Sequence, residues 1–155
     1  MEKVVSKIIG KYATTNIYTD DFITSEKLST VIPNSNFYKA DGKNTFAVSI
    51  GLKSLSGGVS GKIMAGDVVS VYGYNIERKE VVAYDDLKYI EVLSISDSKG
   101  NDLGSDLENK DNIPATVTLM ANGNQIKELI LMENTGNIHI VFAGRGEMAQ
   151  QFLQQ

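Results

Sequence analysis

Short segments in which apolar and polar residues alternate recur along this 155-residue chain, and they constrain its fold more than any other feature. Alternation with period two is typical of a β-strand with one buried face, because successive side chains point to opposite sides. The clearest case is Thr45–Leu52, where Phe46, Val48 and Ile50 share a face. Further strand-type segments are Lys11–Tyr18, Val68–Tyr74, Glu80–Ser96 with a break at Asp85–Asp86, Ala115–Met120 and Asn137–Gly144. The pattern predicts a mainly β protein.

One segment carries the signals of a helix. Asn122 can cap the free amides, Gln125 stands three residues later as in a capping box, and Gly136 follows as a residue suited to end the helix. The apolar stripe at helical spacing consists of Ile126, Leu129 and Ile130. We expect this helix to cover a sheet, which adds an α+β part to the fold. Ile23–Pro33 predicts a short helical turn, and Glu147–Gln155 a terminal helix or tail.

Composition narrows the classes of function. The net charge is −4 and the acids and bases are interspersed, so the chain offers no basic face to nucleic acid. It contains no run of about 18 apolar residues, the length that a membrane span needs. It also contains no cysteine, which excludes disulfides and thiolate metal sites but leaves the compartment open.

A glycine-rich stretch, Ser56–Asn75, raises the question of a phosphate or metal site. A phosphate-binding loop precedes a helix, and a P-loop also needs a Lys-Ser/Thr pair, whereas this stretch leads into a strand. Glycine permits positive φ, and aspartate can accept a hydrogen bond from a nearby amide. We therefore expect Gly61, Gly66 and Asp67 to form a structural turn motif, without a cofactor.

No other set of residues predicts catalysis or metal binding. His139 is the only histidine, and the alternation of its strand turns it away from the buried face. The acidic loop Asp97–Asn112 lacks the spacing of a calcium loop, so we expect it to be a solvated surface loop, although an ion there stays open. Gly144–Glu147 is too short for a dinucleotide fingerprint. We predict no catalytic, cofactor-binding or metal-binding residue.

Four tyrosines lie near the middle of the chain, at positions 72, 74, 84 and 89. Aromatic residues in strands usually belong to a half-buried core, but they can also line a carbohydrate or protein surface. Tyr72 and Tyr74 are our candidates for a recognition surface.

An ordered series of residues resembles a SAF domain, in the version found in the CpaB/RcpC family of Flp (Tad) pilus assembly proteins. The residues at matching places are Ala13, Ile17, Ile23, Leu28, Ala47, Val59, Gly61, Ile63, Gly66, Asp67, Val69 and Val71. The later half resembles the C-terminal region of the family, through a strand, a helix and a strand that end at an arginine-containing segment. The resemblance implies a β-clip SAF lobe over residues 1–75 and a small α+β lobe with one clear helix over residues 76–155.

The sequence departs from the family pattern in two places. Asp20-Asp21-Phe22 stands where the family commonly has a glycine before its Ile-Thr step. The family also carries an N-terminal membrane-anchoring helix, which these 155 residues lack, so we expect an ectodomain without its anchor.

The resemblance implies a non-enzymatic, extracytoplasmic component of pilus assembly. Such a protein would dock onto other pilus-assembly or cell-envelope proteins, or onto cell-wall glycan, and would contact the membrane only through the anchor. One alternative is a carbohydrate-binding SAF module, and another is an assembly chaperone of the flagellar P-ring type. An enzyme ranks last, because no set of titratable residues converges in the sequence.

Overall fold

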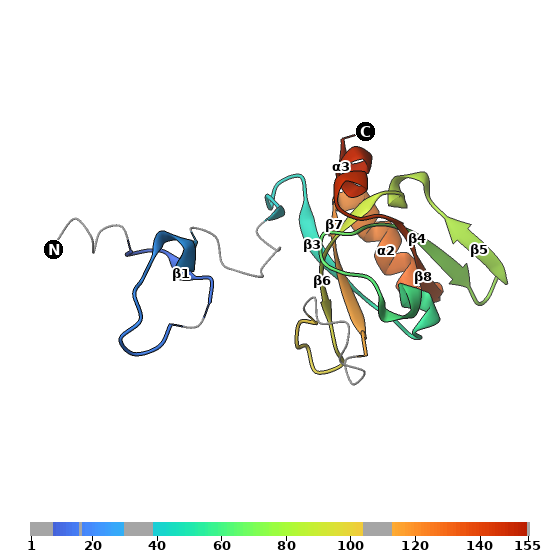
Figure 1. Cartoon of the computed structure of the whole chain (residues 1–155). Coiled ribbons are helices and arrows are strands. Elements are labelled where there is room, and N and C mark those ends of the chain that lie inside the picture. Colours follow the sequence, from blue (N-terminus) through green and yellow to red (C-terminus); the bar gives the residue numbers. More distant parts are fainter. Residues whose placement is uncertain (1–7, 16, 30–38, 104–112, 155) are drawn as a thin grey trace. The chain divides into compact units, whose positions relative to one another are not determined.

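The computed structural model of the protein describes residues 8–15, 17–29, 39–103 and 113–154 (Figure 1). Its contacts divide the chain into two compact units, Met1–Ser35 and Asn36–Gln155. In the first unit, strand β1 (Tyr12–Ala13) pairs antiparallel with β2 (Leu28–Ser29), which follows the 3₁₀ turn η1 (Ser25–Lys27). The strand expected over Lys11–Tyr18 is therefore only two residues long. The helical turn expected within Ile23–Pro33 is confirmed, and the end of that segment lies outside the described residues.

The second unit is built on a six-stranded sheet. Its strands are β3 (Phe46–Gly51), β4 (Val68–Asn75), β5 (Glu80–Ala83), β6 (Ile90–Ser96), β7 (Thr116–Ala121) and β8 (Gly136–Gly144). The order is β3-β7-β6-β4-β5, with β8 paired to β4, and every pair is antiparallel. The predicted break between β5 and β6 is the 3₁₀ turn η4 (Asp85–Leu87). The mainly β fold is confirmed.

Strand β4 is the centre of this sheet. Along one side it pairs first with β6, at Val68 and Val69, and then with β5, from Tyr72 to Asn75. Along its other side it pairs with β8 over its whole length. Strands on both sides of residue 75 thus belong to one sheet. The division into lobes at residues 75 and 76 stays a prediction, and the compact units of the structure separate instead between residues 35 and 36.

Helix α2 (Gly123–Thr135) has the predicted capping box. The Asn122 side chain accepts hydrogen bonds from the amides of Asn124 and Gln125, while the Gln125 side chain accepts one from the Asn122 amide. The predicted apolar stripe is partly wrong. Leu129 is buried, but Ile130 is 49% exposed, and Met132 takes the expected place of Ile130 in the core.

Gly136 ends α2 for a different reason from the one expected. Its φ of 177° is ordinary extended backbone, so no left-handed conformation requires glycine there. A Cβ at this position would overlap the carbonyl oxygen of Tyr74. The glycine allows the chain to leave α2 and pair with β4 at once.

The core lies between the sheet and α2. It includes Val69 and Val71 from β4 and Ile138 and Ile140 from β8, and Gly73 leaves room for Met132 of α2. The short helix α3 (Glu147–Leu153) covers part of the opposite face. Its side chains Met148 and Phe152 lie where a Cβ of Gly144 would point, and Gly144 is paired with the buried Val68.

Candidate functional site

The glycine-rich stretch forms a compact turn. The 3₁₀ segment η3 (Ser56–Gly61) is interrupted by Val59 and Ser60, both with a φ of 53°. Positive φ is unfavourable for a β-branched residue such as valine, so surrounding contacts must hold it. Among these contacts, the Ser60 amide donates to the Leu55 carbonyl at 2.8 Å. Gly61 and Gly66 have φ values of 74° and 89°, which glycine adopts without strain.

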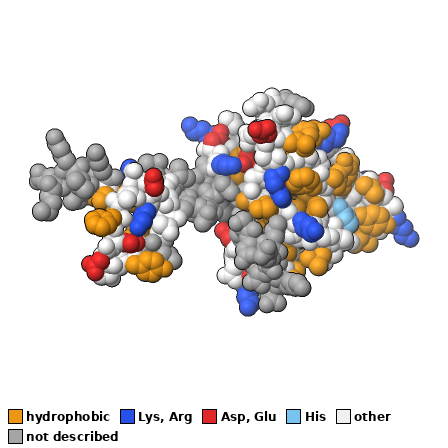
Figure 2. Space-filling view, in the orientation of Figure 1, with side chains coloured by type: hydrophobic (Ala, Val, Ile, Leu, Met, Phe, Trp, Pro, Cys, Tyr) orange, Lys and Arg blue, Asp and Glu red, His pale blue; other side chains and the backbone are white. Residues whose placement is uncertain are grey.

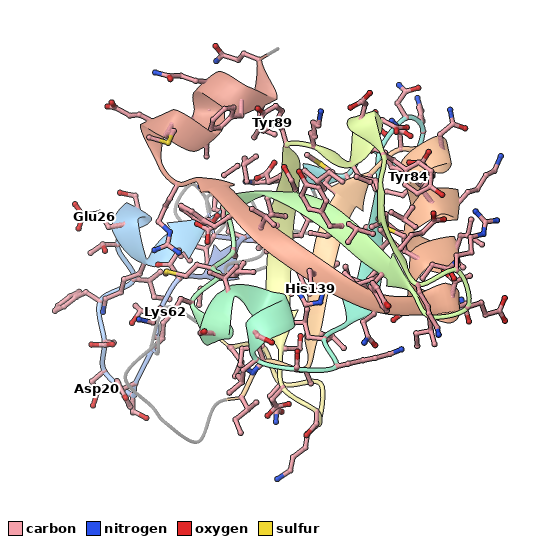
Figure 3. The ribbon with its side chains drawn as sticks, turned by 90° about the vertical axis from the view of Figure 1, so that its right-hand side faces the viewer. Asp20, Glu26, Lys62, Tyr84, Tyr89 and His139 are labelled. Carbon is pink, nitrogen blue, oxygen red and sulfur yellow. The ribbon has the colours of Figure 1, made fainter. Side chains whose placement is uncertain are left out.

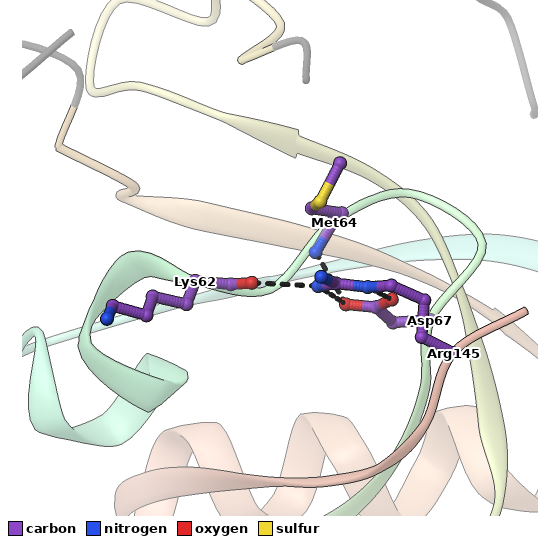
Figure 4. A network of polar contacts seen from close by, with 4 residues as sticks. All are labelled: Lys62, Met64, Asp67 and Arg145. Carbon is purple, nitrogen blue, oxygen red and sulfur yellow. Dashed lines mark hydrogen bonds and ion pairs between the residues drawn. The ribbon is translucent and has the colours of Figure 1, made fainter. Parts of the chain in front are cut away.

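Asp67 is fully buried at the start of β4, and its carboxylate is surrounded by donors (Figure 4). The Met64 amide donates to Oδ2 at 2.7 Å, which closes the turn as expected of an aspartate there. Arg145 donates from Nε to Oδ1 at 2.6 Å and from Nη2 to Oδ2 at 2.8 Å. Its Nη2 also donates to the Lys62 carbonyl at 3.0 Å.

This bidentate pair joins two distant parts of the chain. Arg145 follows β8 directly, so the pair ties the end of β8 to the turn before β4. The hydrogen bonds to Asp67 raise the pKa of Arg145. Because both carboxylate oxygens are occupied by protein donors, the geometry at Gly66 and Asp67 supports a structural role. The sequence contained both residues, but no local spacing links positions that are 78 residues apart.

Tyr72 and Tyr74 lie on the face of the sheet opposite α2. Residues paired across antiparallel strands point to the same face, so Tyr72 lies beside Ala83 and His139, and Tyr74 lies beside Val81 and Asn137. We define the outer patch as five of the exposed or half-buried side chains on this face. Its members are Tyr72, Tyr74, Val81, His139 and Val141.

The outer patch begins where α3 stops covering the sheet. Val68 and Ser70, earlier on the same face of β4, are buried, whereas Tyr74 is 38% exposed. Val81 is 70% exposed on β5, and Val141 is 47% exposed on β8. Figure 2 shows the histidine, in pale blue, bordered by hydrophobic side chains, and Figure 3 shows His139 projecting from the front of the sheet. The expected orientation of His139, away from the core, is confirmed.

The family model of the Flp pilus assembly protein RcpC/CpaB matches residues 40–143, which include the sheet except the last residue of β8. The chain belongs to this family. No curated protein and no solved structure gives a match. In the described part of this RcpC/CpaB family member, no helix is long and apolar enough to cross a membrane.

Within the described residues, the other candidates from the sequence do not converge into a site in this family member. Asp97 binds its own loop, because its carboxylate accepts from the amides of Lys99 and Asn101 and from the Asn101 side chain. These bonds lower the pKa of Asp97. Asp102 accepts from the Ser96 hydroxyl at 3.1 Å, and the rest of the acidic loop lies outside the described residues. Among the residues that the structure describes, no three His, Cys, Asp or Glu residues are grouped as metal ligands.

One pair of carboxyl groups was not predicted. Glu128 of α2 faces Asp86 of η4, and the Gln125 side chain donates to the Asp86 carbonyl. Burial raises the pKa of Glu128, and the negative charge of Asp86 raises it further. The Glu128 Oε2 atom is buried without a hydrogen-bond partner in the described structure. No sequence signal links these residues, because α2 and η4 meet only through the tertiary fold.

Proposed function

We propose that this protein is a non-enzymatic, extracytoplasmic component of Flp pilus assembly that acts by docking onto other proteins of the pilus machine. Its membership of the RcpC/CpaB family supports the role in pilus assembly. The outer patch supports docking, because an exposed group of apolar and aromatic side chains on a sheet is typical of a protein-protein contact.

The outer patch is suited to recognition by a rigid surface. Its side chains stand on β5, β4 and β8, whose backbones are held by cross-strand pairing over four to eight residues. The Asp67–Arg145 pair fixes the other end of β4 against β8. A partner that covers Tyr74, Val81 and Val141 would therefore bury apolar area without having to order a loop, which keeps the entropic cost of binding low.

Replacement of Tyr74 by serine in the bacterium that encodes the protein tests this proposal. Tyr74 is partly exposed, so the substitution should leave the fold intact while it removes a contact residue. We expect fewer surface pili in sheared cell fractions with an unchanged cellular level of the protein. Ile130→Ser is the matched control, because Ile130 is 49% exposed on α2, on the other face of the sheet. Normal piliation after deletion of the whole gene would contradict the proposed role in pilus assembly.

The proposed location is tested separately. A protease added to spheroplasts should degrade the protein while it spares a cytoplasmic marker. Resistance of the protein until the inner membrane is permeabilised would contradict an extracytoplasmic location.

Cell-wall glycan is a second candidate partner, favoured by the pairing of Tyr72 with His139 on the outer patch. Aromatic rings bind the apolar faces of sugars, and imidazole can donate a hydrogen bond to a hydroxyl. A signal on a glycan array that Tyr72→Ala and Tyr74→Ala both abolish would support this partner. A signal that survives both substitutions would exclude the outer patch as the glycan site.

A further inference from the structure

Strand β5 is an edge strand. Within the described residues it pairs with β4 alone, from Tyr72↔Ala83 to Asn75↔Glu80. The backbone groups along its other side therefore have no strand partner in the part of the chain that the structure describes. An edge of this kind is a template for an added strand.

A cavity lies between this edge strand and the second half of α2. Its volume is about 130 Å³. It is lined by Asn75, Arg78, Val82, Tyr84, Leu131, Met132 and Thr135. Cavities for small-molecule ligands typically measure about 300 to 1,000 Å³, so this one is small even for such a ligand and better suited to a single side chain.

The lining is apolar at the centre and polar at the hairpin end. Val82 faces the cavity, while its neighbour Val81 points to the outer patch, as the alternation of a strand requires. Leu131 remains 53% exposed at the cavity although it stands on a helix with a buried face. At the hairpin end, the side chain of Arg78 is 74% exposed, and its contact with Glu80 is a loose surface pair at 3.5 Å.

We propose that this β5–α2 groove binds an extended peptide segment of a partner protein by strand addition. The segment pairs with the free edge of β5, and one of its aliphatic side chains enters the cavity against Val82 and Leu131. A carboxylate of the segment lies near the guanidinium of Arg78, which can release Glu80 at little cost because exposed ion pairs are weak. Main-chain pairing supplies affinity, and the cavity selects the side chain.

The proposal rests on the edge, the cavity and the exposed cation together. A helix partner would fill the cavity but leave the backbone of β5 unpaired. A second copy of this chain could pair with the same edge through its own β5. The Val82 side chain of that strand already lines the cavity of its own copy, so it would not fill a second cavity. An extended peptide with an aliphatic and an acidic residue is the occupant that uses all three features.

The test uses the purified full chain and a displayed library of random twelve-residue peptides. We expect selection to enrich peptides with one aliphatic position and a nearby acidic residue. A synthetic copy of an enriched peptide should bind in fluorescence anisotropy. Leu131→Gln should weaken this binding about tenfold, because it replaces an apolar wall of the cavity by a polar amide.

Two matched controls separate the groove from general effects. Ile130→Gln changes the neighbouring exposed aliphatic residue, which does not line the cavity, and should leave the affinity unchanged. The same peptide with alternate amides N-methylated should bind poorly if the contact is strand addition. When the peptide is titrated into the protein, the backbone amide resonances that shift in NMR spectra should belong to residues of β5 and α2.

Several results would overturn the proposal. These are a library that enriches no common sequence, equal loss of affinity in Leu131→Gln and Ile130→Gln, full binding of the N-methylated peptide, and amide shifts confined to the outer patch. Dimerisation of the free protein that Leu131→Gln abolishes would assign the groove to a second copy instead. All these measurements use purified protein, so their failure leaves the proposed role in pilus assembly untouched.

Discussion

At the residue scale, the ion pair of Asp67 and Arg145 joins the end of β8 to the turn before β4. Asp67→Asn keeps the volume and one acceptor but removes the charge that Arg145 binds. We expect the free energy of unfolding to fall by about 2 to 3 kcal/mol, because hydrogen bonds between charged groups are strong and half of Arg145 is shielded from water. Urea denaturation followed by circular dichroism measures this loss.

The control for that measurement is the exposed pair of Lys88 and Asp85, whose N–O distance is 2.7 Å. Asp85→Asn should not shift the urea midpoint, because the Asp85 carboxylate is almost fully exposed and solvent screens the pair. If both substitutions shifted the midpoint equally, burial of Asp67 would not be the source of the stability.

Also at the residue scale, Gly66 and Gly136 should tolerate a Cβ to different degrees, for different physical reasons. A Cβ on Gly66 meets no atom within 4 Å, so Gly66→Ala should cost only the strain of its positive φ, about 1 to 2 kcal/mol. Gly136→Ala should prevent folding, because its Cβ would overlap the Tyr74 carbonyl. Thermal unfolding of the two variants compares these effects, and a milder loss for Gly136→Ala would contradict the close approach of β8 to β4.

At the element scale, α2 depends on its first turn. Asn122→Ala removes the acceptor for two amides and should lower the free energy of unfolding by about 1 kcal/mol. Asn124→Ala is the control, since Asn124 is exposed and takes part in the cap through its backbone amide alone. Urea denaturation should separate the two variants, because alanine favours the helix at position 124. An equal loss would show that the Asn122 side chain is not the specific source of the stability.

The contact of α2 with η4 should make stability depend on pH. The pKa of Glu128 is raised in the folded protein, so the folded state holds this proton more tightly than the unfolded chain. As pH rises from the pKa of an unfolded glutamate, about 4.3, through the raised pKa in the folded protein, the Glu128 carboxyl loses its proton and the free energy of unfolding falls. Glu128→Gln should raise the urea midpoint near pH 7 and change it little below about pH 4. Glu77→Gln is the control, because Glu77 is exposed, and it should not change the urea midpoint at either pH. Equal midpoint shifts for Glu128→Gln at both pH values would argue against a raised pKa of Glu128.

At the scale of the whole molecule, the second unit should fold without the first. Residues 36–155 contain the six-stranded sheet, helices α2 and α3, and the segment that the family model matches. The first unit has a two-stranded sheet and exposes large apolar side chains such as Phe22, at 86%. Two strands alone are rarely stable in water.

We expect a fragment of residues 36–155 to unfold cooperatively at the temperature of the full chain, and a fragment of residues 1–35 to lack dispersed amide resonances. A much lower transition for the longer fragment would show that the first unit stabilises the second.

Features that depend on near neighbours can be read from the amino-acid sequence alone. Strands β3 to β8 lie in the segments that the sequence predicted, and the start of α2 follows from Asn122 and Gln125, since these signals act within a few residues. Membership of the family was also readable, because its motif is an ordered series along the chain.

Contacts between distant positions depend on the folded arrangement of the chain. This arrangement made β4 the centre of one sheet, brought Arg145 to Asp67, set Glu128 against Asp86, and left the edge of β5 open beside α2. It also replaced Ile130 by Met132 in the core, because the direction of α2 over the sheet selects which side of the helix is buried. Local patterns fix which face of an element is apolar, whereas only packing fixes what that face meets.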